Sequence, residues 1–190
     1  LSSSSAASDV YKRQAIDLGI AMVPEDRQRQ GLALPLSVET NLLLPSLNAF
    51  QGITGLDRSQ MRSISGQLIS KLGIKTGSPD NPASALSGGN QQKIVLGKWI
   101  HQNPSLFILD EPTRGVDVGA KSEVHRMIIE LAKQGSAVLL ISSELPEILS
   151  LSDRILVIAK GHVSGELARE EANQEKLLKL SLPEEAKQSP

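Results

Sequence analysis

Hydrophobic positions recur along the chain with two different spacings, which predict two kinds of element. Short apolar runs end the stretch 15–24 and fill SLFILD (105–110) and SAVLLIS (136–142), and the last two runs are continuous enough for buried strands. Apolar residues three or four positions apart mark 57–72 and 118–134 as amphipathic helices. Because strands alternate with helices through the middle of the chain, we expect an α/β domain with a largely parallel sheet.

Capping residues and helix breakers refine the ends of these elements. Ser37, followed by Glu39 in the first turn, opens a predicted helix over 37–49, and Gly73 ends the helix that starts at Asp57. Another helix is expected after the two glycines of LSGG and before Pro104. The polar or glycine- and proline-containing stretches are predicted to be loops, namely 25–31, 50–56 and 76–85.

The last third of the chain predicts smaller elements. We expect a short helix over 146–152 and a hairpin over 155–167 that turns at a Lys-Gly pair. The tail from residue 168 is charged and helix-prone, and we expect 184–190 to be frayed.

Composition narrows the class of protein. Twenty basic and 21 acidic residues nearly cancel, so no overall field draws the chain onto nucleic acid. The chain has no cysteine, which excludes disulfides and thiolate metal sites. With one Trp, one Tyr and two Phe, the core must be aliphatic. The chain also offers few aromatic side chains on which the bases of single-stranded nucleic acid could stack. We therefore expect no nucleic-acid partner.

The first 14 residues, LSSSSAASDVYKRQ, differ from the rest. They lack an initiator Met and the apolar centre of a signal peptide. We set 1–14 aside as a non-native lead; the alternative is a natural, disordered, serine-rich lead. The domain proper is then predicted to cover 15–183.

The stretch LSGGNQQK (86–93) predicts an anion site at a helix start. Two glycines there leave backbone N–H groups accessible, the helix dipole favours negative charge, and Ser87 adds a hydroxyl. By itself, such a turn is more often a simple helix cap.

The stretch LFILDE (106–111) predicts a carboxylate site. A buried strand there delivers Asp110 and Glu111 to the carboxyl edge of the sheet, where open α/β folds bind ligands. Asp110 can hold Mg²⁺, partly through water, and Glu111 can polarise an attacking water. The simpler alternative is a strand that ends in two solvated acids.

Residues 115–122, GVDVGAKS, differ by one residue from a phosphate-binding loop, G-x-x-x-x-G-K-[ST]. Ala120 stands where the second glycine belongs, and the stretch follows the acidic strand end rather than leaving a strand directly. We therefore interpret 114–117 as a connecting segment with Asp117 as its key acid, and expect Lys121 and Ser122 exposed on the next helix.

The order of these motifs, continued by ISSELPEI and SDRILVIAKGHVSGEL and preceded by VPEDRQRQGL, resembles the ATP-binding subunits of ABC transporters. The resemblance covers roughly residues 15–183. It is greatest to the C-terminal nucleotide-binding half of the double-cassette ATPases of bacterial monosaccharide importers, of the ribose and galactose type. It implies a P-loop NTPase-type cassette with a helical signature subdomain at about 31–102.

The resemblance also implies roles for single residues. Ser87, Gly88, Gly89 and Asn90 would close over ATP held by the N-terminal cassette of the same polypeptide. Asp110, Glu111 and Ser143 would serve a second ATP with Mg²⁺, with Glu25 contacting the metal and Asp117 the partner cassette. No other G-x-x-x-x-G-K-[ST] occurs in the chain, so we expect a partial cassette without its phosphate-loop region, unable to hydrolyse ATP alone.

Two positions depart from the general pattern of that family. Glu25 in VPED stands where most cassettes have glutamine, and a carboxylate only accepts hydrogen bonds. Ser143 in ISSE stands where most have histidine, and a serine is too short to replace its contact directly. Both departures put catalytic competence of the Asp110–Glu111 site in doubt.

The resemblance further implies transmembrane permease subunits, indirectly a periplasmic sugar-binding protein, and a peripheral location on the cytoplasmic face of the inner membrane. Leu42, Leu43 and Leu47 are candidates for lining the permease groove, although core positions are the simpler interpretation. The three histidines show no metal-ligand spacing. Two alternatives stay open, a degenerate regulatory half and an ABC ATPase without a membrane partner, and the transported sugar is not specified.

Overall fold

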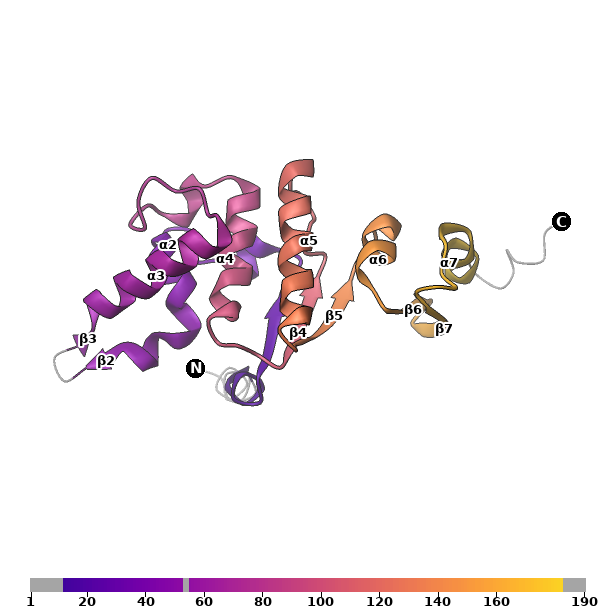
Figure 1. Ribbon diagram of the computed structural model, residues 1–190, viewed down its shortest axis with the longest axis horizontal. Coiled ribbons are helices and arrows are strands. Elements are labelled where there is room, and N and C mark those ends of the chain that lie inside the picture. Colours follow the sequence, from indigo (N-terminus) through magenta and orange to yellow (C-terminus); the bar gives the residue numbers. More distant parts are fainter. Residues whose placement is uncertain (1–11, 53–54, 183–190) are drawn as a thin grey trace, which may run out of the picture. The chain divides into compact units, whose positions relative to one another are not determined.

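The computed structural model describes residues 12–52 and 55–182, which form two compact units. The first unit ends at Ile141 and the second begins at Ser142. Figure 1 shows the order of the elements along the chain. The predicted frayed tail at 184–190 and most of the 1–14 lead lie outside the described residues. Residues 12–17 are helical, and Leu18 N–H donates to the Gln14 carbonyl at 3.0 Å.

The sheet of the first unit is parallel, as the alternation of strands and helices predicts. Its strands are β1 (Ile20–Val23), β4 (Leu106–Asp110) and β5 (Ala137–Ile141), in the order β1-β4-β5. Val23 lies opposite Leu109, and Asp110 lies opposite Ile141. All three carboxyl ends therefore meet at one edge of the sheet, where Asp110 is the last strand residue.

Two long helices, α4 (Gly88–Ile100) and α5 (Val118–Lys133), cover one face of this sheet. The strand residues on that face are fully buried, as are the helix residues that meet them: Ala21, Val23, Phe107, Leu109, Ile94, Val95 and Val124. In Figure 1, α4 lies between α5 and the helices α2 (Val38–Leu43) and α3 (Arg58–Leu72). Residues 91–98 of α4 are buried on every side, so α4 is the central helix of the unit.

The opposite face of the sheet is more open, which corrects the prediction that β5 is fully buried. Leu139 and Ile141 are 50% and 45% exposed, and Met22 on β1 is 47% exposed. Burial in this sheet follows the two-residue period of each strand, because the helices of the described unit cover one face only.

The helical part of the first unit is built from α2 (Val38–Leu43), a 3₁₀ segment η2 (Leu44–Phe50), α3 (Arg58–Leu72) and the central α4. The predicted cap at Ser37 and the predicted helix end at Gly73 are confirmed, and Asp57 is a further cap that the sequence analysis did not predict. The Ser37 side chain accepts from Thr40 N–H, the Asp57 side chain accepts from Gln60 N–H, and Gly73 ends α3 in the left-handed region at φ 58°. Leu42 and Leu43 are fully buried because α2 packs on α3 and α4, so they occupy the core positions that were the simpler interpretation and do not line a groove.

All three stretches predicted as loops contain some regular structure. Residues 27–31 form a π-helical turn, η1 (Arg27–Gly31), because the Asp26 side chain accepts from Gln28 and Arg29 N–H and so caps it. The 50–56 stretch contains a small antiparallel pair, β2 (Gln51–Gly52) with β3 (Gly55–Leu56). A short 3₁₀ turn, η3 (Ala83–Ala85), precedes the LSGGNQQK stretch (86–93). The loop predictions for 25–31 and 50–56 failed because local side-chain caps and strand pairing are not visible in a hydrophobicity pattern.

The second unit is a helix-flanked hairpin. Its elements are α6 (Leu145–Leu151), β6 (Arg154–Ala159), β7 (His162–Ala168) and α7 (Gln174–Ser181). The predicted Lys-Gly turn is confirmed, with φ of 50° at Lys160 and 78° at Gly161, as a tight hairpin turn requires. Ile155, Val157, Ala172 and Leu177 form its core.

Across the described ranges, 12–52 and 55–182, no helix combines the length and apolar character needed to cross a membrane.

Candidate functional site

The amino end of α4 is open to an anion. Ser87 is the N-cap residue, yet its side chain makes no capping bond to the helix. The N–H groups of the first turn, at Gly88, Gly89 and Asn90, precede the first intrahelical donor, Gln91, which bonds to the Ser87 carbonyl at 2.9 Å. Backbone donors and the helix dipole therefore both favour a negative group at this point.

The Ser87 hydroxyl is held by a neighbour on the same turn. Asn90 Nδ2 donates to Ser87 Oγ at 2.9 Å, and Asn90 Oδ1 accepts from Lys75 N–H at 2.8 Å. Because Ser87 Oγ accepts from Asn90, its own proton remains available for an acceptor outside the turn. Asn90 thus acts as a support that orients the serine and ties the turn to the end of α3.

Both glycines of the turn are required by close neighbours rather than by unusual dihedral angles. A Cβ on Gly88 would lie 2.7 Å from Arg27 Nη2 and 3.1 Å from the Gly115 carbonyl oxygen. A Cβ on Gly89 would lie 2.6 Å from the Cβ of Ala120. The turn formed by residues 87–90, called the signature turn from here on, is therefore in direct contact with both η1 and the 114–120 segment.

The predicted carboxylates stand at the end of β4. Asp110 is half-buried and makes no ion pair with any described residue. Glu111 adopts a left-handed backbone, at φ 46°, and its N–H donates to the Ile141 carbonyl at 2.9 Å. A non-glycine residue in this region is strained, and such strain is common at functional sites.

The stretch that resembles a phosphate loop does not form one. Gly115 makes a turn at φ 67°, Asp117 is the N-cap of α5, and Asp117 Oδ1 accepts from Ala120 N–H at 2.9 Å. Gly119 and Ala120 lie inside the first turn of α5. Ser122 is exposed as predicted, but Lys121 is half-buried, which corrects that expectation.

Glu25 follows β1 at the same edge of the sheet and is engaged by a cation. Its carboxylate forms an ion pair with the guanidinium of Arg114. Asp110 has the half-buried carboxylate that suits a hydrated Mg²⁺, whereas Glu25 would have to leave Arg114 to bind the metal. Among the described residues, no three carboxylates, histidines or cysteines form a metal-binding group.

Ser143 belongs to the second unit, where it is exposed two residues after β5 ends. The neighbouring Ser142 Oγ accepts from Glu144 N–H at 3.0 Å. The role of Ser143 beside the carboxylates stays a prediction. His101 stacks on Phe50, with ring centroids 6.3 Å apart.

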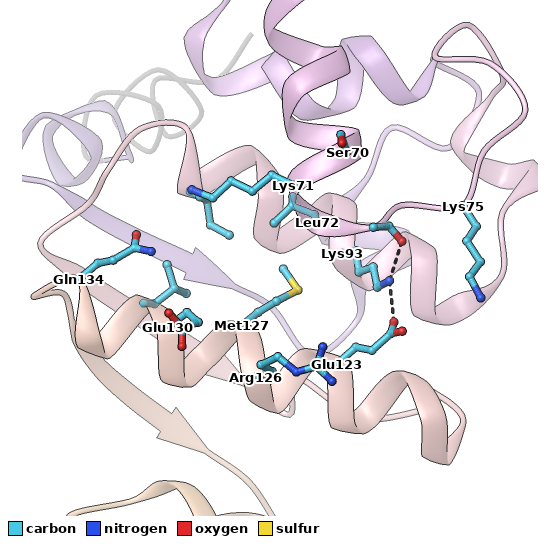
Figure 2. A pocket seen from close by; sticks show the side chains of 13 residues that line it. Ser70, Lys71, Leu72, Lys75, Lys93, Glu123, Arg126, Met127, Glu130 and Gln134 are labelled. Carbon is cyan, nitrogen blue, oxygen red and sulfur yellow. Dashed lines mark hydrogen bonds and ion pairs between the residues drawn. The ribbon is translucent and has the colours of Figure 1, made fainter.

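Buried lysines fix α4 to its neighbours. Lys93 Nζ bonds to the Gly73 carbonyl at 2.7 Å and pairs with Glu123 on α5 at 2.6 Å, as Figure 2 shows. The hydrogen bond from Lys93 lowers the pKa of the Glu123 carboxyl below its usual value. Lys98 Nζ donates to the Gly31 carbonyl at 2.6 Å, and burial lowers the pKa of Lys98 to about 8.

A pocket of about 520 Å³ lies beside the Lys93–Glu123 pair, between the end of α3, α4 and α5 (Figure 2). Lys71, Lys75 and Arg126 stand around it, and Leu72, Met127 and Leu131 contribute apolar surface. None of the residues predicted for the nucleotide site lines this pocket.

Two arginines, Arg27 and Arg114, belong to the site without having been predicted from the sequence. Arg27 donates to the carbonyls of Arg114 and Gly115, and Arg114 pairs with Glu25. The residues joined by these contacts are 87 to 89 positions apart, so no local pattern marks them. The site thus joins a signature turn, a strand-end acid pair and two arginines in one region of the first unit.

Known proteins resemble this chain over most of its length. The family model described as "ABC transporter" matches residues 3–114. The chain is 50% identical over 169 residues to the ribose import ATP-binding protein RbsA of Geobacillus kaustophilus, which covers 89% of the chain and 34% of that relative. It is also 50% identical over 169 residues, 89% of the chain and 32% of the relative, to a Rhizobium etli protein provisionally named a ribose/galactose/methyl galactoside import ATP-binding protein. The chain therefore spans about a third of the length of these curated relatives.

Solved structures share the fold at low identity. An ATP-binding cassette in a dimeric post-hydrolysis state with ADP and phosphate matches with a TM-score of 0.69 at 18% identity, over 83% of this chain and 66% of that one. The cbiO1 protein of Clostridium perfringens, part of an ABC transporter complex, matches with a TM-score of 0.67 at 22% identity, over 86% and 62%. These matches support the ABC cassette fold.

Proposed function

Because the chain belongs to the ABC transporter family, we propose that it is part of an ATPase that energises import of a monosaccharide across the bacterial inner membrane. The observation that carries this proposal is the amino end of α4. There the Ser87 side chain makes no capping bond to the helix, and three backbone N–H groups can donate to an anion. The sugar-import names of relatives at 50% identity support the substrate class.

In the proposed function, the signature turn completes an ATP site in the N-terminal cassette of the same polypeptide. Ser87 donates its hydroxyl proton, and Gly88, Gly89 and Asn90 donate N–H groups, to the terminal phosphate of that ATP. These donors are prepositioned, because Asn90 holds Ser87 and buried residues hold α4. Preorganised donors of this kind stabilise charge that develops during phosphoryl transfer.

The strand-end acids would serve a second ATP, whose phosphates are held by residues outside this chain. Glu111 would polarise the attacking water, and Ser143 would support the terminal phosphate. Asp110, with Glu25 once released from Arg114, would hold Mg²⁺, which when bound neutralises charge on the phosphates. Asp117 would contact the partner cassette.

The proposal includes permease subunits in the membrane and, through them, a periplasmic sugar-binding protein. The ATPase would then lie on the cytoplasmic face as a peripheral subunit. ATP binding would draw the two cassettes together, and hydrolysis would let them reopen.

The test compares Gly88→Asp and Glu111→Gln in the complete double-cassette protein, assayed for transport and ATPase activity with its permease. Gly88→Asp places a carboxylate where a phosphate should bind, and we expect transport to fall on the order of a hundredfold or more. Glu111→Gln should reduce transport less than Gly88→Asp does if the signature turn contributes more to function than the strand-end acids. Gly66→Asp is the matched control, because nothing lies within 4 Å of a Cβ on exposed Gly66. Equal loss from Gly88→Asp and Glu111→Gln contradicts the asymmetry.

One observation favours a second candidate, a regulatory half that binds nucleotide without turnover. Glu25 and Ser143 both differ from the general pattern of the ABC family at the Asp110–Glu111 site. Glu25 is also already paired with Arg114. Single-turnover hydrolysis, with the phosphate-loop lysine of the N-terminal cassette replaced, separates the two. Hydrolysis in that variant supports catalysis at the Asp110–Glu111 site, and its absence supports the regulatory half.

A further inference from the structure

Arg27 contacts two segments of the site outside its own turn, and we propose that it is a positioning residue that aligns the signature turn with the 114–117 segment. The inference rests on the proposed function, since it concerns the rate at which that site works. Arg27 itself lies in η1, directly after Glu25 and Asp26 and close to the end of β1.

The guanidinium bridges two consecutive carbonyls. Arg27 Nη1 donates to the Arg114 carbonyl at 2.7 Å, and Nη2 donates to the Gly115 carbonyl at 3.1 Å. A planar fork can satisfy two adjacent acceptors at once, whereas an ammonium group offers a single point charge. The pair of bonds therefore fixes the turn at Gly115, which leads into the Asp117 cap of α5.

The same guanidinium lies against the signature turn. Arg27 Nη2 is the atom that a Cβ on Gly88 would approach most closely, at 2.7 Å, so only glycine permits this contact. Since Gly89 meets Ala120 at the next position, α4 and α5 contact each other directly beside the arginine. A shift of Arg27 would therefore move two donors of the proposed phosphate site relative to Asp117.

Two further features argue that Arg27 is retained for alignment. Its Nε is buried and makes no hydrogen bond to any described residue, an unfavourable arrangement that native proteins usually avoid away from functional sites. The ion pair between Glu25 and Arg114 closes a ring, because Arg27 in turn holds the Arg114 carbonyl. Any change in the partner of Glu25 is thus transmitted to the segment that Arg27 clamps.

The experiment measures steady-state ATPase activity of the complete double-cassette protein with its permease, for Arg27→Gln, Arg27→Lys and Gly88→Asp. Arg29→Gln is the matched control, since the Arg29 side chain is on the same turn, is 88% exposed and, among the residues that the structure describes, forms an ion pair with Asp26 alone, at 3.7 Å. Arg27→Gln should lower kcat by roughly ten- to a hundredfold, as a misalignment near 1 Å does, while KM for ATP changes less than about twofold. Arg27→Lys should recover part of kcat, and Arg29→Gln should match the unaltered protein.

The outcomes separate this inference from the proposed function. If Gly88→Asp is inactive while Arg27→Gln keeps an unaltered kcat, the positioning role is overturned and the proposed function stands. If Gly88→Asp keeps full activity, the proposed function itself fails. A loss in Arg27→Gln that follows a lowered thermal unfolding midpoint, with no recovery in Arg27→Lys, assigns Arg27 to stability and also overturns the positioning role.

Discussion

Gly89 and Ala120 form one closely packed contact between the signature turn and the start of α5. Ala120 is the residue that breaks the phosphate-loop pattern in GVDVGAKS, and the structure gives it a packing role. A Cβ on Gly89 would lie 2.6 Å from the Ala120 Cβ, a separation that two methyl groups cannot adopt. The two positions together therefore have room for one methyl group.

We expect Gly89→Ala to destabilise the protein although alanine favours helices. Overpacking costs about 1–3 kcal/mol, which exceeds the roughly 1 kcal/mol that alanine gains over glycine in a helix. Moving the methyl group, with Gly89→Ala and Ala120→Gly together, should restore most of the stability. Thermal unfolding of both single variants and the double variant measures the coupling; additive effects would contradict this contact.

Lys98 predicts a pH dependence of stability. Burial lowers its pKa from 10.5 to about 8, so between these two pH values the unfolded chain binds the proton and the native protein does not. The free energy of unfolding should then rise with pH across this window, by roughly 3 kcal/mol from this group. The bond from Nζ to the Gly31 carbonyl can form in either protonation state.

The comparison that isolates this effect is Lys98→Met, followed by urea unfolding from pH 7.5 to 10.5. The unaltered protein should gain stability relative to the variant as the pH rises. Parallel curves for the two proteins would show that Lys98 titrates normally in the fold.

At the scale of elements, the close packing of α4 against its neighbours requires glycine at position 97. A Cβ on Gly97 would lie 2.5 Å from Leu72 Cδ1 and 2.9 Å from Leu42 Cδ2, both of which are buried. Gly97 thus lets α2 and α3 pack closely against the central helix.

Two glycine-to-alanine changes in helices should therefore have opposite effects. Gly97→Ala should lower the free energy of unfolding by about 1–3 kcal/mol through overpacking. Gly66→Ala on α3 should raise it by up to about 1 kcal/mol, because a Cβ there meets nothing within 4 Å. Urea unfolding checks both, and a stabilising Gly97→Ala would mean that Leu72 and Leu42 can move aside.

For the whole molecule, we predict that this 190-residue chain alone binds ATP weakly. Its sequence contains no G-x-x-x-x-G-K-[ST], and the one near match lies in the turn before α5 and in the helix itself. The signature turn alone offers a few N–H groups and no lysine cradle for the phosphates. Calorimetric titration with Mg-ATP should show no micromolar binding, and a micromolar Kd would refute the prediction.

The strand-end carboxylates and the signature turn were predictable because each depends on short-range order. The apolar run of β4 places Asp110 at a sheet edge, and Ser87 with two glycines marks a helix start whatever lies around them. The π-helical turn at 27–31 and the exposed alternation of β5 were not predictable. The first depends on the Asp26 cap, and the second on how many helices cover the sheet.

Residue order alone was sufficient for the parallel α/β pattern, the cap at Ser37, the helix end at Gly73 and the family resemblance, because these follow from local spacing and from motifs in fixed order. The contacts of Arg27, the pairing of Glu25 with Arg114, and the packing of Gly89 on Ala120 appear only when the chain is folded. The reason is physical: these contacts join residues 31 to 89 positions apart, and their energies depend on distances that no one-dimensional pattern contains.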